Sequence, residues 1–158
     1  MPGGYMTSID YQDIFESFLG NVQDYGFNEM SKSDVHSLLR EYLHKAVSNI
    51  YVYRLFSSLT LDDEIETLTF EVAHVIEESI DTDFVTTVLA KQMVYEWVHP
   101  QVRNVVNTAQ MFGGSEQKFY AQANHLSELR ALEEDTVLEV RRLIRDRNFI
   151  YNDYLSGS

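Results

Sequence analysis

A single helix of about 30 residues is predicted near the end of this chain, from about Gln117 to Arg147. Its apolar residues recur at helical spacing, in the stripe Leu126, Leu129, Leu132, Val137, Val140, Leu143 and Ile144. At roughly 1.5 Å per residue such a helix is about 45 Å long, which exceeds the width of a small domain. In a chain of 158 residues we therefore expect part of this helix to pack on something other than its own chain.

Three shorter helices are predicted before it. The first begins after Asp10 and ends at Gly20-Asn21, and the second runs from Ser31 or Ser33 to about Tyr51. The third is capped by Asp81 or Asp83, and Pro100 is expected to kink it or to start a fresh helix. The fold class expected from this pattern is mainly α, a helical bundle with one long C-terminal helix.

The segment from about Leu55 to Val72 changes period, because its apolar residues recur nearly every second position. We interpret it as an inserted β-hairpin whose acidic tip is Asp62, Asp63 and Glu64. The spacing of Ile65, Leu68 and Val72 would also fit a helix. A lone hairpin is marginally stable in water, so the hairpin is a candidate edge for contact with another subunit.

The charge of the chain limits its partners. The formal net charge is −13, which argues against wrapping nucleic acid because phosphate neutralisation needs a basic surface. The charge is also uneven: Leu55 to Ala90 contain nine acids and no Lys or Arg, while four arginines lie between Arg141 and Arg147. Such runs usually form solvated faces, and the alternative is complementary contact between subunits or partners. No secretory signal or membrane span is expected, and the absence of cysteine excludes disulfides and thiolate sites.

Catalytic chemistry finds little support in the sequence. Two Glu-x-x-His spacings, Glu41–His44 and Glu71–His74, have the form used by helical di-iron sites, which Glu96 and Glu133 could complete. The two motifs are only 30 residues apart and the second adjoins the predicted hairpin, so surface histidines beside acids are the favoured interpretation. Gly113-Gly114 lacks the spacing of a phosphate loop. We therefore predict no enzyme, catalytic residue, metal or cofactor.

The C-terminal residues carry the predicted contact chemistry instead. Gly113 and Gly114 are interpreted as a hinge that lets the chain reverse before the long helix. Aromatic residues and arginine, which are enriched at interface hot spots, gather near the end of the chain. The predicted portal or inter-subunit contact residues are Arg141, Arg145, Arg147, Phe149, Ile150, Tyr151, Tyr154 and Leu155.

Three stretches resemble the head–tail connector (neck adaptor) proteins of tailed bacteriophages. They are "YRLFSS" (Tyr53–Ser58), "MFGGSEQKFYAQANHLSELR" (Met111–Arg130) and "RRLIRDRNFIYNDYL" (Arg141–Leu155). The likeness covers about Asp10 to Leu155, and no catalytic motif anchors it. We expect a disordered leader over 1–9 from the residues themselves, and the resemblance implies a helical connector domain, placed over 10–147, and an extended C-terminal arm, placed over 148–158.

The resemblance further implies a structural virion protein, assembled in the host cytoplasm. About twelve copies would form a ring below the portal protein and contact the next neck or tail-completion protein. DNA would pass through the lumen without specific binding, and an acidic lumen would let it slide. A small terminase subunit, a tail-completion protein and, more remotely, a helical di-iron carboxylate protein remain as alternatives.

Overall fold

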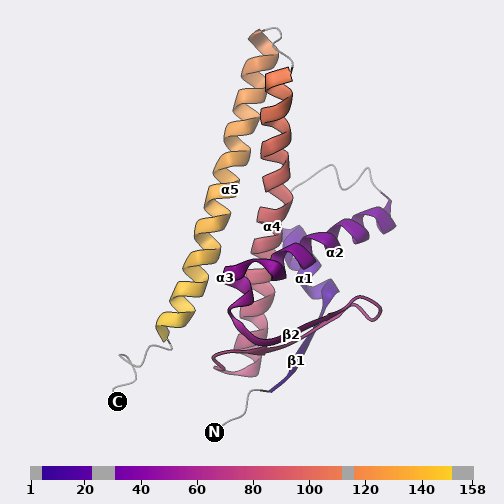
Figure 1. Cartoon of the computed structure of the whole chain (residues 1–158), viewed down its shortest axis with the longest axis vertical. Coiled ribbons are helices and arrows are strands. Elements are labelled where there is room, and N and C mark those ends of the chain that lie inside the picture. The colour runs from indigo at the N-terminus through magenta and orange to yellow at the C-terminus, as the bar shows by residue number, and fades with distance from the viewer. Residues whose placement is uncertain (1–4, 23–30, 112–115, 151–158) are drawn as a thin grey trace.

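The computed structural model describes residues 5–22, 31–111 and 116–150, with the side chains of 105–124 and of Ile150 left out. Within these ranges the elements follow the order β1 (Thr7–Asp10), α1 (Tyr11–Asn21), α2 (Lys32–Ser48), α3 (Ile50–Tyr53), β2 (Phe56–Asp62), β3 (Thr67–Val72), α4 (Glu78–Met111) and α5 (Glu116–Ile150). The prediction of a mainly α protein with a hairpin insertion and a long C-terminal helix is thereby confirmed (Figure 1).

The hairpin belongs to a three-stranded antiparallel sheet of order β1-β3-β2. Thr7 pairs with Phe70 and Ile9 with Leu68, and Ile9 is only 3% exposed. The leader expected over 1–9 is therefore wrong for Thr7, Ser8 and Ile9, which form a strand. The physical reason is that β1 is too short to give a periodic signal and takes its hydrogen-bonding partner from a strand about 60 residues away in sequence.

The core lies between α4 and the elements that pack against it, namely α1, α2 and the sheet. Helices α1 and α2 both pack against α4, and the inner face of the sheet closes the same core. The residues that fill it share very low exposure and helical or alternating spacing: Tyr11, Ile14, Phe15, Phe18, Leu43, Leu68, Phe70, Val85, Leu89 and Met93. Burial on this scale supplies the main favourable free energy of folding.

The two long helices form an antiparallel hairpin that extends beyond the body made by α1, α2, α3 and the sheet (Figure 1). Helix α4 has 34 residues and α5 has 35, so the long C-terminal helix has a partner helix of similar length within its own chain. Helix α4 begins at Glu78, about one turn before the predicted caps. It continues through Pro100 to Met111, so of the two alternatives expected at Pro100, a kink or a fresh start, the fresh start does not occur.

Candidate interaction surfaces

The predicted contact residues on α5 do not share one environment. Arg141, Arg145 and Phe149 are exposed, and the residue Phe149 is 60% exposed. Arg147 is only 7% exposed. Ile150 ends α5 without a described side chain, while Tyr151, Tyr154, Leu155 and the hinge residues Gly113 and Gly114 lie outside the described residues. Helix α5 continues to Ile150, three residues beyond the predicted end of the helical domain at Arg147.

Arg147, predicted as a portal or inter-subunit contact, is largely buried and has a structural role that the prediction did not include. Its Nη2 donates to Asp81 Oδ1 at 2.6 Å and to the backbone oxygen of His74 at 2.7 Å, and its guanidinium lies 4.6 Å from the centre of the Phe84 ring. Asp81 is 1% exposed and also accepts the backbone N–H of Ile76 at 3.1 Å. These contacts fasten the end of α5 to the start of α4. Sequence spacing cannot reveal a partner 66 residues away.

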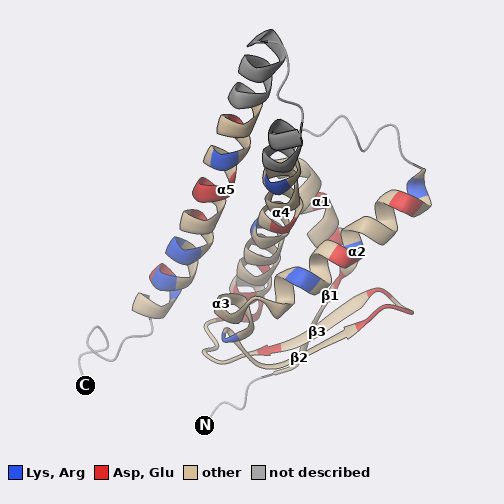
Figure 2. Ribbon diagram, turned by 45° about the horizontal axis from the view of Figure 1, so that its top comes forward, with Lys and Arg blue, Asp and Glu red and all other residues tan. Residues whose placement is uncertain are grey.

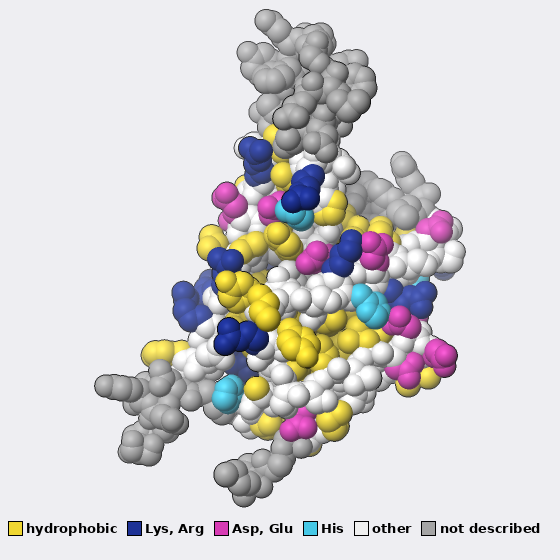
Figure 3. Space-filling model, viewed as in Figure 1, with side chains coloured by type: hydrophobic (Ala, Val, Ile, Leu, Met, Phe, Trp, Pro, Cys, Tyr) yellow, Lys and Arg dark blue, Asp and Glu magenta, His cyan; other side chains and the backbone are white. Residues whose placement is uncertain are grey.

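An exposed surface that we name the aromatic–arginine patch lies over α3 and the neighbouring part of α5. It consists of Ile50, Tyr51, Tyr53, Arg54 and Arg141. The Arg141 guanidinium lies 5.0 Å from the centre of the Tyr51 ring, which joins the two helices. Ile50 and Tyr53 are 61% and 58% exposed, unusual for such large side chains in one short helix. Yellow apolar and dark-blue basic surface lie side by side in this region (Figure 3).

A cleft opens beside this patch, with a volume of about 380 Å³. Its lining combines apolar and basic side chains, namely Tyr51, Arg54, Leu55, His74, Ile144, Arg147 and Asn148. Arg147 forms an ion pair with Asp81, whereas no ion pair involves Arg54 within the described ranges. The cleft therefore offers an apolar wall and one unmatched guanidinium.

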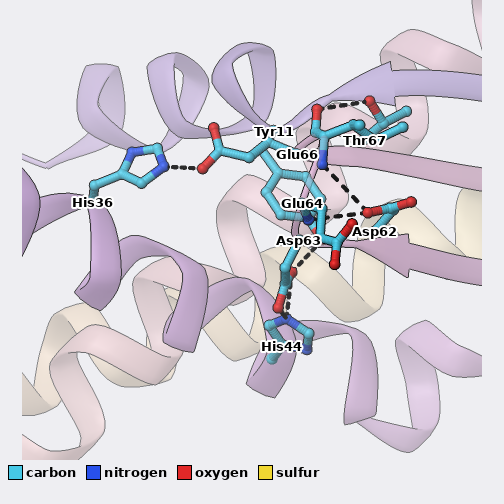
Figure 4. Close-up of polar contacts among 9 residues, drawn as sticks. Tyr11, His36, His44, Asp62, Asp63, Glu64, Glu66 and Thr67 are labelled. Atoms are coloured by element: carbon cyan, nitrogen blue, oxygen red, sulfur yellow. Dashed lines mark hydrogen bonds and ion pairs between the residues drawn. The ribbon is translucent and has the colours of Figure 1, made fainter.

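On the other side of the molecule, side chains of α1 and α2 contact the acidic tip of the hairpin. The buried Tyr11 donates its hydroxyl to Asp63 Oδ1 at 2.7 Å, and His44 Nε2 lies 2.9 and 3.0 Å from the two Asp63 oxygens. His36 Nε2 makes a second contact of this kind, with Glu66 Oε1 (Figure 4). Asp63 of the predicted acidic tip is exposed and also anchors the turn to α1 and α2.

The electrostatics of this anchor follow from its geometry. Burial of the Tyr11 ring, together with the hydrogen bond to Asp63, raises the pKa of Tyr11 above its ordinary value. The hydrogen bonds from Tyr11 and from His44 hold the pKa of Asp63 below its ordinary value. A carboxylate that accepts several hydrogen bonds stays ionised. The tip is therefore a charged and locally fixed structure.

The remaining tip residues either fix the turn or are exposed to solvent. Asp62 accepts the backbone N–H groups of Glu64 at 3.0 Å and of Ile65 at 3.3 Å, which fixes the turn. Glu64 is exposed and the Ile65 side chain is 69% accessible. Glu66 takes the left-handed backbone conformation, with φ of 53°, while its carbonyl accepts the N–H of Tyr11 at 2.8 Å. The acidic colour at this turn and the basic colour along α5 lie on different sides of the molecule (Figure 2).

The residues of the di-iron alternative do not converge. Glu41 pairs with Lys45 at 2.8 Å, His44 faces Asp63, and Glu133 lies 3.4 Å from His99. Within the part of the chain that the structure describes, no group of three or more His, Asp or Glu residues could hold a metal ion. Glu41 and His44 of the first Glu-x-x-His spacing thus have separate local partners.

The described residues form a mainly α fold with a small three-stranded antiparallel sheet. Among them, no helix is both long and apolar enough to cross a membrane. Comparison of the whole chain with protein-family models, curated proteins and solved structures found no match.

Proposed function

We propose that this chain is a structural protein of the tailed-phage neck, a connector subunit that forms a ring of about twelve copies beneath the portal. The proposal rests on the resemblance of three sequence stretches together with the surface chemistry of the fold. The ring joins the DNA-filled head to the tail, and the protein acts in the virion.

One observation carries the proposal: the aromatic–arginine patch on an otherwise acidic protein. Tyrosine and arginine are the residues that most often dominate binding energy at protein interfaces. Tyr51 and Arg141 already hold each other through a cation–π contact, so little side-chain freedom is lost when a partner covers them. This surface suits attachment to another protein of the neck, with the portal as the first candidate.

The charge of the chain supports a conduit rather than a DNA-binding role. A net charge of −13 opposes the approach of a phosphate backbone to the molecule as a whole. A small terminase, which must bind DNA, therefore fits less well than a connector. A tail-completion protein shares the same surface chemistry and differs in its attachment partner.

Native mass spectrometry of the full chain, alone and mixed with the portal protein of the same phage genome, tests the proposal. We expect about twelve copies per portal ring and no bound metal. A chain that stays monomeric at high concentration and also fails to bind the portal would refute the connector function. Metal that survives purification would favour the di-iron alternative.

Two matched variants sharpen this experiment. Arg141→Glu should weaken portal binding because it reverses the charge of the patch and breaks the contact with Tyr51. Arg130→Glu changes an exposed arginine of the same helix three turns earlier, away from the patch, and should bind normally. Equal binding by both variants would place the attachment surface elsewhere. Deletion of 151–158 then asks whether the residues after α5 are needed for attachment, as the sequence predicts.

A further inference from the structure

The tip of the β2–β3 hairpin has the properties of a preformed docking element. Three side chains outside the sheet hold it: Tyr11 and His44 through Asp63, and His36 through Glu66. Because the turn is already fixed, little conformational entropy remains to be lost when it binds. What projects from this fixed base is the exposed Ile65 flanked by acidic side chains.

The cleft beside the aromatic–arginine patch has complementary properties. Its volume of about 380 Å³ could hold roughly a dozen water molecules, which is ample room for one isoleucine side chain and a neighbouring carboxylate. Leu55 and Ile144 offer an apolar wall, and Arg54 offers a positive charge. The tip carries an apolar side chain next to the acids Asp62 and Glu64, so the two surfaces match in both hydrophobicity and charge.

These two surfaces lie on opposite sides of the body (Figure 1). The hairpin turn projects away from α5, while the cleft lies at the C-terminal end of α5 beside α3. The tip of one molecule therefore cannot occupy the cleft of the same molecule. Complementary surfaces on opposite sides define a head-to-tail contact, which closes into a ring when the rotation between copies allows it.

We propose that the hairpin tip of one copy docks into the cleft beside Arg54 of the next copy, with Ile65 inserted and Glu64 facing Arg54. This inference rests on the proposed ring and specifies the contact that builds it. The occupant of the cleft is a second copy of this chain. The portal and the chain's own residues 151–158 are the competing occupants that the experiment separates.

The absence of cysteine from the chain allows a direct test by cross-linking. Full-length Ile65→Cys and Arg54→Cys proteins are prepared separately, mixed during assembly, with and without portal, and treated with a short bismaleimide. Both positions are exposed, so the fold should survive, which circular dichroism verifies. We expect a covalent dimer in the mixture and none from either variant alone. Ser127→Cys, an exposed position on α5, replaces Arg54→Cys in the control mixture and should give no dimer.

Charge exchange gives an independent readout in sedimentation or mass photometry. Glu64→Arg and Arg54→Glu should each weaken self-association about tenfold, equivalent to about 1.4 kcal/mol, and the mixture of the two variants should recover much of the loss at the swapped contact. Failure of the mixture to recover any association would contradict a direct Glu64–Arg54 contact.

The outcomes separate this inference from the proposed function. Rings that form without the 54–65 cross-link would overturn the docking contact and leave the connector function standing. A 54–65 cross-link in a protein that never binds a portal would support the contact and refute the portal attachment that the proposed function includes. A cross-link from Arg54→Cys to the portal alone, or a 54–65 cross-link that appears only after deletion of 151–158, would assign the cleft to another occupant and overturn the inference.

Discussion

Removal of the Asp81 carboxylate should destabilise the protein strongly, because it leaves the buried guanidinium of Arg147 without a counter-charge. Breaking a buried ion pair from one side typically costs about 3–5 kcal/mol. The 2.6 Å contact and the exposures of 1% and 7% place this pair in that class. The lower end of the range is expected for Asp81→Ala, since the last turn of α5 can unwind and let Arg147 reach water. A loss of about 3 kcal/mol is a large fraction of the 5–15 kcal/mol typical of folded domains.

Urea unfolding followed by the fluorescence of Trp97, the single tryptophan, measures this loss. For a slope of about 2 kcal/mol per molar urea, a loss of about 3 kcal/mol lowers the midpoint by about 1.5 M. Asp83→Ala is the matched control, because Asp83 is an exposed acid two residues away on the same helix and should change stability by less than about 0.5 kcal/mol.

A double variant tests whether the cost comes from the unpaired charge. Asp81→Leu combined with Arg147→Met removes both charges and should recover much of the stability, since apolar replacements of buried pairs are often neutral. If Asp81→Ala and Asp83→Ala had equal midpoints, the buried ion pair would contribute nothing measurable and the account of Arg147 as a structural residue would fail.

Tyr11→Phe should keep the ring packing but lose the hydrogen bond to Asp63, costing about 1 kcal/mol and lowering the thermal midpoint by about 2–4 °C in calorimetry. Because the folded-state pKa of Asp63 is depressed, its contribution to stability is present above its ordinary pKa and is lost as pH falls below about 4. Between pH 5 and pH 3 the urea midpoint of the Asp63→Asn variant should therefore fall less steeply with pH than that of the unaltered protein. An equal fall in both proteins would contradict the stabilising role of the Asp63 carboxylate. Phe70→Ala, at a site 1% exposed, should cost about 3–5 kcal/mol, whereas Ile65→Ser at the exposed tip should alter stability by less than about 0.5 kcal/mol; similar losses from both in urea unfolding would refute the burial argument.

Elements with a strong local pattern could be predicted from the sequence. The apolar spacing around Ile14 and Phe18 predicts α1, and Ser31 caps α2 by accepting the N–H of Asp34 at 3.2 Å. The change to alternating residues predicts the hairpin, whose strands pair from Phe56 with Val72 to Asp62 with Thr67. In each case the information lies within a window of a few residues.

What could not be predicted depends on partners distant in sequence. Arg147 and Phe149 belong to the same arginine- and aromatic-rich segment, yet one is buried against Asp81 and the other is exposed. Asp62 and Asp63 are adjacent acids, but only Asp63 meets the Tyr11 hydroxyl. Strand β1 needs the edge of β3 before it has a structure at all. Composition alone could not separate structural residues from surface residues in these segments.

The position of α4 at the centre of the core governs the order in which a growing chain can become folded during synthesis. Helices α1 and α2 rest chiefly on α4, so they lack their main packing partner until Val85 to Val98 have left the ribosome. Strand β1 likewise waits for β3, a contact of long sequence separation that is slow to close. The α4–α5 pairing, by contrast, joins neighbours in sequence and can form quickly once both helices exist. The first half of the chain therefore spends its synthesis with apolar faces uncovered, and an early stop in translation before α4 would release a fragment prone to aggregation.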